Sequence, residues 1–248
     1  MSYHIVLDLE MNPVSEFHVS ASHGLRTETI EIGAIKIDAS TNEIVDEYTC
    51  VVKPEFNYRI EPKITRLTGI TTNEVRLARH FQAALADFVH WIGTENITIY
   101  SWSPSDYAQI HNECAAKDIM FPTEFTNWID FQAEYPKYLG YSQHKCLSLK
   151  KAAQLIGTTM IPGCAHRALY DAQITADLVL FALNGEYKHY KSRISTAMDN
   201  TNTTMTYSIG DACGNKLAAL LSRLNDNEER EVPSYGAQYI GTAAAFIR

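Results

Sequence analysis

The sequence has few cysteines and no long apolar run, and each absence excludes a class of protein. No stretch approaches the about 20 consecutive apolar residues of a membrane helix, so no membrane partner is expected. The first residues lack a basic region and lead directly into a strand pattern, which argues against a secretory signal. The cysteines form no Cys-x-x-Cys pair, so neither a zinc site nor a disulfide framework is indicated, and a reducing, cytoplasmic setting is expected. The five cysteines are Cys50, Cys114, Cys146, Cys164 and Cys213.

Basic residues are also scarce. The chain carries 21 Lys and Arg against 29 Asp and Glu, a formal net charge of −8. This balance argues against a protein that reads nucleic acid through a broad basic face. An enzyme that holds nucleic acid through metal ions in an acidic cleft is still allowed, because bound cations supply the positive charge there.

What is present is ordinary globular material. The 248 residues are 46% hydrophobic and 20% charged, which fits one domain with an extension. The chain begins with three consecutive strand patterns joined by turns, which predicts antiparallel pairing, and then alternates helices with two further strands. This order predicts an α/β fold with a mixed five-stranded sheet, its last two strands parallel, flanked by helices. The expected strands span residues 3–10, 29–38, 43–53, 97–102 and 128–131. The expected helices span residues 62–67, 72–92, 103–117, 148–156 and 166–183.

The pattern weakens after the last of these helices. We therefore predict a domain over residues 1–186 and a C-terminal extension of unknown role over residues 187–248. Within the extension, residues 195–207 are polar and threonine-rich, as in a linker, and residues 216–224 fit a short helix.

Two carboxylates end the first strand. Asp8 and Glu10 are separated by one residue, so they point to the same side of the strand. Adjacent carboxylates repel and resist burial unless a positive charge lies between them, and a divalent cation with oxygen ligands meets that need. The alternative is that the strand simply ends here and water solvates both acids.

A third acid, Asp106, follows the fourth strand at the expected start of a helix. Loops and helix starts after strands are where α/β sheets place ligands. Asp in a first helical turn can also be a capping or dipole-stabilising residue. For Asp106 taken alone, that explanation is preferred over a ligand.

The last strong helix opens with His166 and Asp171. Five residues apart on one helix, their side chains would diverge by about 140°. They converge if His166 lies in the loop before the helix and Asp171 in its first turns, and Pro162-Gly163 makes a loop there reasonable. A surface histidine beside a helix-start aspartate is the alternative.

Together these motifs resemble the DEDDh 3′–5′ exonucleases, the DnaQ-like group of the ribonuclease H-like superfamily. The resemblance covers residues 3–185 and depends on motif order and secondary-structure context, because each motif is short. Segments 31–35, 66–71 and 101–106 are similar to the subgroup of KapD and the histone-mRNA 3′ exonucleases, in which a Trp precedes the middle Asp as Trp102 does here. Ser103-Pro104-Ser105 departs from the acidic or glycine-containing segment usual at that point.

The resemblance implies a metal-dependent phosphodiester hydrolase. It assigns two divalent ions, Mg²⁺ or Mn²⁺, to Asp8, Glu10, Asp106 and Asp171. It makes His166 the general base, with Glu10 as the second catalytic residue. The expected reaction releases nucleoside 5′-monophosphates from the 3′ end of single-stranded nucleic acid, with RNA slightly favoured over DNA.

Substrate contacts are expected around the first motif. Glu10 and His166 are expected to bind substrate as well, and Met11 offers a soft apolar surface to a base. Asn12 is expected to hydrogen-bond sugar or base. Trp102 is a further candidate for stacking on a base, although core packing explains it at least as well.

Three other functions compete with this one. A catalytically inactive ribonuclease H-like module that binds nucleic acid or protein would fit if one of the five motif residues were missing, but all five are present. A DNA proofreading-type exonuclease subunit is a narrower alternative. A phosphatase-like hydrolase would require a nucleophile motif or a Gly-rich phosphate loop, and the sequence has neither.

Overall fold

The structure is a computed structural model that describes residues 1–15, 22–94, 96–138, 146–161 and 164–187. All of these belong to the first of the two units into which the chain divides, Met1–Tyr207; the second is Ser208–Arg248. The expectations for the extension beyond residue 187 lie outside the described residues, and the boundary at residue 186 stays a prediction.

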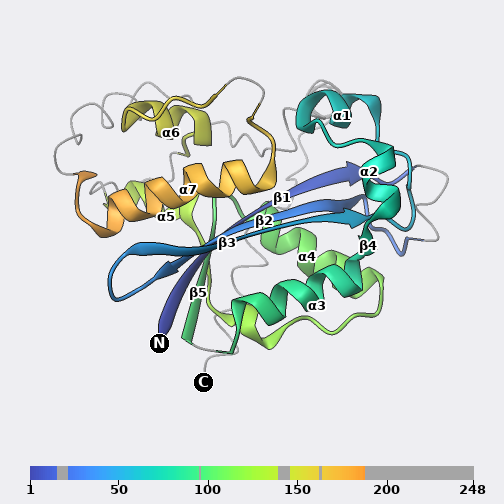
Figure 1. Ribbon diagram of the computed structural model, residues 1–248, viewed down its shortest axis with the longest axis horizontal. Coiled ribbons are helices and arrows are strands. Elements are labelled where there is room, and N and C mark those ends of the chain that lie inside the picture. The colour runs from blue at the N-terminus through green and yellow to red at the C-terminus, as the bar shows by residue number, and fades with distance from the viewer. Residues whose placement is uncertain (16–21, 95, 139–145, 162–163, 188–248) are drawn as a thin grey trace, which may run out of the picture. The chain divides into compact units, whose positions relative to one another are not determined.

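A mixed sheet organises the described part of the chain (Figure 1). Its strands have the order β4-β3-β2-β1-β5-β6; β1 pairs antiparallel with β2, and β2 with β3, whereas β5 runs parallel to both β1 and β6. This confirms the expected arrangement, with six strands in place of five. The bounds are β1 Ser2–Pro13, β2 Thr27–Asp38, β3 Glu43–Lys53, β4 Arg79–His80, β5 Asn96–Ser101 and β6 Trp128–Asp130.

The added strand, β4, interrupts what we expected to be one helix over residues 72–92. The chain instead forms α2 (Thr72–Leu77) and α3 (Phe81–Ile92). Between them Ala78 is extended, with φ −77° and ψ 168°, and β4 pairs in parallel with the end of β3. Leu77, which helical spacing would put on the apolar face of a single helix over residues 72–92, is 80% exposed. Sheet pairing therefore overrides the local helical periodicity.

The other helices begin and end within a few residues of expectation, except that α5 was missed. Its eight residues include Pro136, and proline usually argues against a helix interior. None of the helices in the described ranges is long and apolar enough to cross a membrane. The bounds are α1 Pro62–Thr68, α4 Ser105–Ala116, α5 Phe131–Tyr138, α6 Leu149–Leu155 and α7 Ala168–Leu183, with a 3₁₀ turn η2 at Thr123–Thr126.

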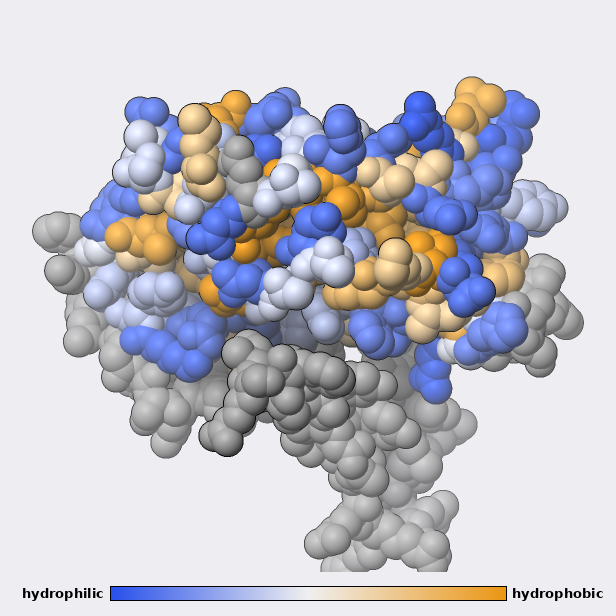
Figure 2. Space-filling view, turned by 90° about the horizontal axis from the view of Figure 1, so that it is seen from below, coloured by the Kyte–Doolittle hydropathy of each residue, from blue (hydrophilic) through white to orange (hydrophobic). Residues whose placement is uncertain are grey.

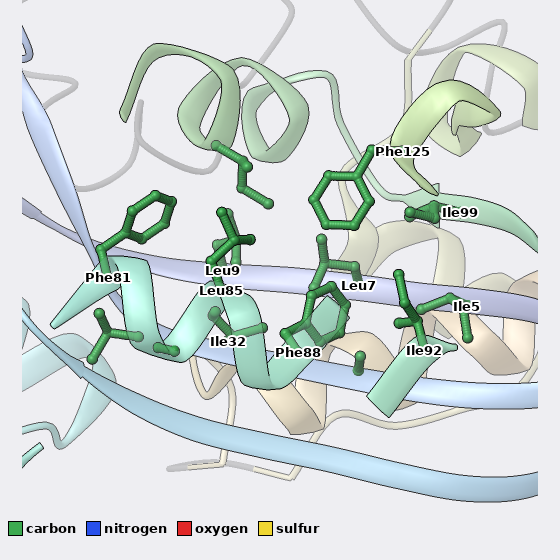
Figure 3. Close-up of a cluster of buried hydrophobic side chains, with 14 of the residues drawn as sticks. Ile5, Leu7, Leu9, Ile32, Phe81, Leu85, Phe88, Ile92, Ile99 and Phe125 are labelled. Atoms are coloured by element: carbon green, nitrogen blue, oxygen red, sulfur yellow. The ribbon is translucent and has the colours of Figure 1, made fainter. Parts of the chain in front are cut away.

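Helices cover both faces of the sheet and enclose two hydrophobic cores. Helices α3 and α4 bury one core (Figure 3), and α5, α6 and α7 bury the other. Seen from the α3 side, apolar residues gather in a band across the middle of the face (Figure 2). Partly buried side chains that pack against the α3-side core include Val89, Trp91, Phe121 and Trp128.

The alternation along β1 decides where its acids point. Leu7 and Leu9 enter the α3-side core, whereas Val6 enters the core on the α7 side. Because strand side chains alternate in direction, Asp8 and Glu10 follow Val6 onto the α7 side. The sheet therefore presents both carboxylates to α7.

A buried ion cluster stabilises the C-terminal end of α4. The Nζ atom of Lys117 lies 2.8 Å from a carboxylate oxygen of Glu113 and 3.2 Å from one of Glu28, and both carboxylate side chains are fully buried. Glu28 also accepts hydrogen bonds from the backbone N–H groups of residues 55–57. The cluster thus joins the start of β2, the end of α4 and the loop that follows β3.

Removing the cation from this cluster is expected to cost much more than removing a surface cation. Lys117→Met leaves two buried carboxylates without a neutralising cation, so the free energy of unfolding should fall by about 3–5 kcal/mol. Lys137→Met is the matched control, because Lys137 pairs with Glu134 at the surface and such pairs contribute about 0–1 kcal/mol. Urea unfolding followed by circular dichroism measures both. Equal losses would show that burial of the cluster has no energetic consequence.

Candidate active site

The ends of three segments bring the acids of the sequence motifs together. Asp8 and Glu10 come from β1, Asp106 lies in the first turn of α4, and Asp171 lies in the first turn of α7. The ligand atoms of Glu10, His166 and Asp171 all lie within 4.8 Å of one another. The structure therefore joins residues from opposite ends of the domain into one group.

Asp106 reaches this group because β5 leaves β1. The two strands pair only as far as Val6 and Tyr100. Beyond that point the edge of β1 is open, and the backbone N–H of Leu9 donates to Oδ1 of Asp106 at 3.2 Å. The diverging strand ends place a carboxylate beside β1, as expected for ligand sites in α/β sheets.

The carboxylates disfavour one another's charged form. Burial raises the pKa of Asp106 to about 7 and that of Asp171 to about 6. Burial, and then repulsion from neighbouring carboxylates, raises the pKa of Asp8 and of Glu10 well above the ordinary range. Such a cluster requires positive charge when ionised.

A divalent cation fits this donor set. Oδ1 of Asp171 is buried and has no hydrogen-bond partner within the described residues, so one ligand atom is uncommitted. Hard cations such as Mg²⁺ and Mn²⁺ prefer carboxylate oxygens. The residues that would hold them are Asp8, Glu10, Asp106 and Asp171. His166 lies close enough to Glu10 and Asp171 to be either a ligand or a base.

His166 occupies the loop immediately before α7, the position in which it can converge with Asp171; the helix expected over residues 166–183 begins at Ala168. The backbone of His166 has φ 65°, in the left-handed region that few non-glycine residues adopt. The backbone N–H of His166 donates to Oδ2 of Asp171 at 3.1 Å. The turn that joins the two residues is therefore fixed by the acid itself, and the half-buried imidazole lies beside the carboxylates.

The helix that carries Asp171 packs unusually closely on the sheet. A Cβ atom added at Gly33 in β2 would lie 2.0 Å from the backbone nitrogen of Leu169 and 2.2 Å from the carbonyl carbon of Ala168. Only glycine at position 33 allows α7 to start at this height above β2. The sequence interpretation included Gly33 only within the motif 31–35, and missed this role.

The same strand supplies a second support that the sequence interpretation did not identify. Glu31, which is 1% exposed, accepts hydrogen bonds from the Arg167 side chain and from the backbone N–H of Ala168. The sequence does contain a signal for this role of Glu31. Glu31 is the one acidic residue in an otherwise buried and apolar run from Ile30 to Ile35.

The two residues after Glu10 differ in what they offer a substrate. Asn12 is fully buried. Its amide donates to the carbonyl oxygens of Asn57 and Arg59 and accepts from the backbone N–H of Glu61. Asn12 therefore has no surface for sugar or base and instead anchors the loop before α1. Met11 is partly exposed and packs against the α3-side core, so it stays a candidate.

Trp102 has the packing role that was the alternative to base stacking. It is 7% exposed within the α7-side core. Its Nε1 donates to the carbonyl oxygen of Leu147 at 3.2 Å. The indole therefore supports the end of β5, from which the chain turns toward Asp106.

Comparison with known proteins matches most of the chain to a family. The model of the exonuclease family (RNase_T) matches residues 5–179. The chain is 25% identical over 197 residues to ERI1 exoribonuclease 2 of Mus musculus, covering 71% of this chain and 28% of that protein. It is 26% identical over 165 residues to the 3′-5′ exonuclease Snipper of Drosophila melanogaster, covering 59% and 57%. It is 28% identical over 120 residues to human 3′-5′ exoribonuclease 1, covering 45% and 34%. The chain thus spans between about a quarter and somewhat more than half of these relatives' lengths.

Solved structures share the fold. The nuclease domain of 3′hExo, a DEDDh family member, superposes with a TM-score of 0.64 at 22% identity, covering 73% of this chain and 92% of that chain. A second structure, cell-death related nuclease 4, gives a TM-score of 0.62 at 19% identity, covering 73% and 64%. The mixed sheet with its flanking helices is therefore the ribonuclease H-like fold that the motif order predicted.

Proposed function

The chain belongs to the exonuclease family, and from that premise we propose that it is a metal-dependent 3′–5′ exonuclease acting on single-stranded nucleic acid. The products are nucleoside 5′-monophosphates, and RNA is preferred over DNA. The observation that carries the proposal is the convergence of Glu10, His166 and Asp171 within 4.8 Å, beside Asp8 and Asp106.

The acidic side chains bind the cofactor in this mechanism. Asp8, Glu10, Asp106 and Asp171 would hold two divalent ions, Mg²⁺ or Mn²⁺, which would supply Lewis acidity toward water and the scissile phosphate. Four carboxylates roughly balance two dications. Bound cations would therefore offset the burial and the mutual repulsion that raise the pKa of Asp8 and of Glu10.

His166 is the proton acceptor of the proposal. An imidazole can take the proton of an attacking water, as a general base does. The hydrogen bond from its backbone to Asp171 holds the loop so that the imidazole faces Glu10. Met11 provides the apolar contact for the terminal nucleotide, and recognition of a 2′-hydroxyl would fall to the backbone near Glu10 and Met11.

The preference for RNA depends on the relatives and not on geometry. Two of the similar proteins are named exoribonucleases, from Mus musculus and from Homo sapiens. Because the chain spans only part of those proteins, the preference is tested directly below.

The test is digestion of a single-stranded RNA and its DNA counterpart, each 5′-labelled, with Mg²⁺, with Mn²⁺ and with chelator. A ladder that shortens from the 3′ end only when metal is present is the expected result, with RNA degraded faster. Faster digestion of DNA would favour the proofreading-type alternative. A folded protein that binds metal but cleaves neither strand would favour the inactive binding module and contradict the proposal.

His166→Asn is expected to slow hydrolysis about 10²- to 10⁴-fold, the usual contribution of a general base. Asparagine tolerates the left-handed backbone at this position, so the fold should be retained. Single-turnover rates give the effect on chemistry, and calorimetric titration with Mn²⁺ shows whether metal affinity is kept. His90→Asn, on the exposed side of α3, is the control. Loss of Mn²⁺ affinity in His166→Asn would make the residue a ligand and not the base.

A further inference from the structure

The helix that carries Asp171 has no cap of its own. Its N-cap residue is Arg167, which makes no side-chain capping hydrogen bond. The first N–H groups of a helix otherwise need an acceptor. Here Oε2 of Glu31, from β2, accepts from the backbone N–H of Ala168 at 2.8 Å. The start of α7 is therefore determined by a strand residue 137 positions earlier in the chain.

Glu31 also binds Arg167. The Nε atom of Arg167 lies 3.1 Å from each carboxylate oxygen of Glu31, and its Nη2 donates to Oε1. Bidentate pairs of this kind fix orientation as well as charge. The carboxylate is 1% exposed and the guanidinium side chain 41%, so the contact is sheltered on the Glu31 side.

Both partners are directly connected to the acids of the site. Glu31 lies opposite Glu10 in the β1–β2 register. The carbonyl oxygen of Arg167 accepts from the backbone N–H of Asp171 at 2.9 Å, and Arg167 follows His166 in the chain. A shift of Arg167 or Ala168 would consequently move His166 and Asp171 together.

The local backbone supports this interpretation. His166 adopts φ 65°, which costs free energy and persists only where its surroundings impose it. The groups that impose it are the hydrogen bond from His166 to Asp171 on one side and the Glu31 contacts to residues 167 and 168 on the other.

We infer that Glu31 and Arg167 form a positioning pair that sets His166 and Asp171 in register with the carboxylates of β1. The inference rests on the proposed exonuclease function, which it deepens. Neither residue touches the reacting atoms in this scheme. Glu31 acts by capping and locating α7, and Arg167 acts by locking the turn that begins it.

The experiment compares Glu31→Gln, Arg167→Met and the double variant in the full chain. Each single variant should reduce kcat on 5′-labelled RNA about 10²-fold, the effect of misplacing catalytic groups by about 1 Å, with KM changed by less than about threefold. The double variant should lose no more kcat than the more impaired of the two single variants, because the two residues act as one unit. The Mn²⁺ affinity of both single variants should fall, since the ligand Asp171 moves with the turn.

Glu134→Gln is the matched control, because Glu134 takes part in an exposed ion pair outside the site. Rates are measured well below the melting temperature of every variant. If kcat and Mn²⁺ affinity are unchanged while melting temperature falls, the pair only stabilises the fold and the inference is wrong. If the unmodified chain binds Mn²⁺ but has no activity, the exonuclease proposal fails separately, and the Mn²⁺ affinities of the variants still decide the role of the pair.

Discussion

Asp106→Asn is expected to lose at least about 10³-fold in turnover and to melt at a higher temperature than the unmodified protein when metal is absent. The loss follows because a ligand carboxylate is worth several kcal/mol of transition-state stabilisation. The melting temperature rises because the substitution removes a buried charge that lies beside Asp8. The asparagine oxygen can still accept from the Leu9 N–H, so no backbone group loses its partner. Scanning calorimetry in chelator, at pH 7.5, should show a rise of about 2 °C or more.

The increase in melting temperature caused by Asp106→Asn should grow as the pH rises. The pKa of Asp106 is raised to about 7 in the folded protein, whereas in an unfolded chain an aspartate titrates near pH 3.9. Between these values the folded state binds more protons, so the Asp106 carboxyl lowers stability as the pH rises. The difference in melting temperature between Asp106→Asn and the unmodified protein should therefore be near zero at pH 4 and complete above pH 7.

Asp118→Asn provides the control for both measurements. Asp118 is exposed just beyond α4 and has φ 53°, which asparagine accommodates. Its turnover and melting temperature should match those of the unmodified protein at every pH. A melting temperature of Asp106→Asn that falls in chelator would show that the buried, ionised Asp106 does not destabilise the folded state.

Gly33→Ala is expected to abolish activity and to destabilise the fold. The added methyl group would lie 2.0 Å from the backbone of Leu169, so α7 must move away from β2 and take Asp171 with it. No truncation of a side chain relieves the clash, because the opposing atoms are backbone atoms of residues 168 and 169. Overpacking of this kind costs about 1–3 kcal/mol or more. Urea unfolding gives the stability, and Mn²⁺ titration reports whether the ligand set survives.

Gly93→Ala separates this steric effect from backbone strain. Gly93 ends α3 with φ 82°, and a Cβ there meets no atom within 4 Å. The Gly93→Ala substitution should cost about 1–3 kcal/mol through its positive-φ, extended backbone alone. Its activity below the melting temperature should be unchanged. Normal turnover by a folded Gly33→Ala protein would mean that α7 can shift without disturbing the site.

The sequence by itself determined the face on which the first two acids lie. Residues of β1 alternate, so once Leu7 and Leu9 are buried on one side, Asp8 and Glu10 must share the other. It also predicted the order of the elements other than β4, α5 and the 3₁₀ turn. For His166 it offered a position in the loop before the helix containing Asp171 as the arrangement in which the two converge, and the structure has that arrangement. These features depend on local spacing and turn chemistry, which neighbouring residues encode.

Only the tertiary structure decided how the pieces close on one another. The break at Ala78 follows from pairing with β3, which overrides a helical pattern. Asn12 was expected to contact the substrate, but its side chain instead hydrogen-bonds to the loop before α1. The contact between Leu9 and Asp106 spans 97 residues, and the cap of α7 by Glu31 spans about 137. No local pattern specifies partners so far apart, because their pairing depends on where strands diverge and how closely a helix can approach the sheet. These two non-local contacts are what assemble the site.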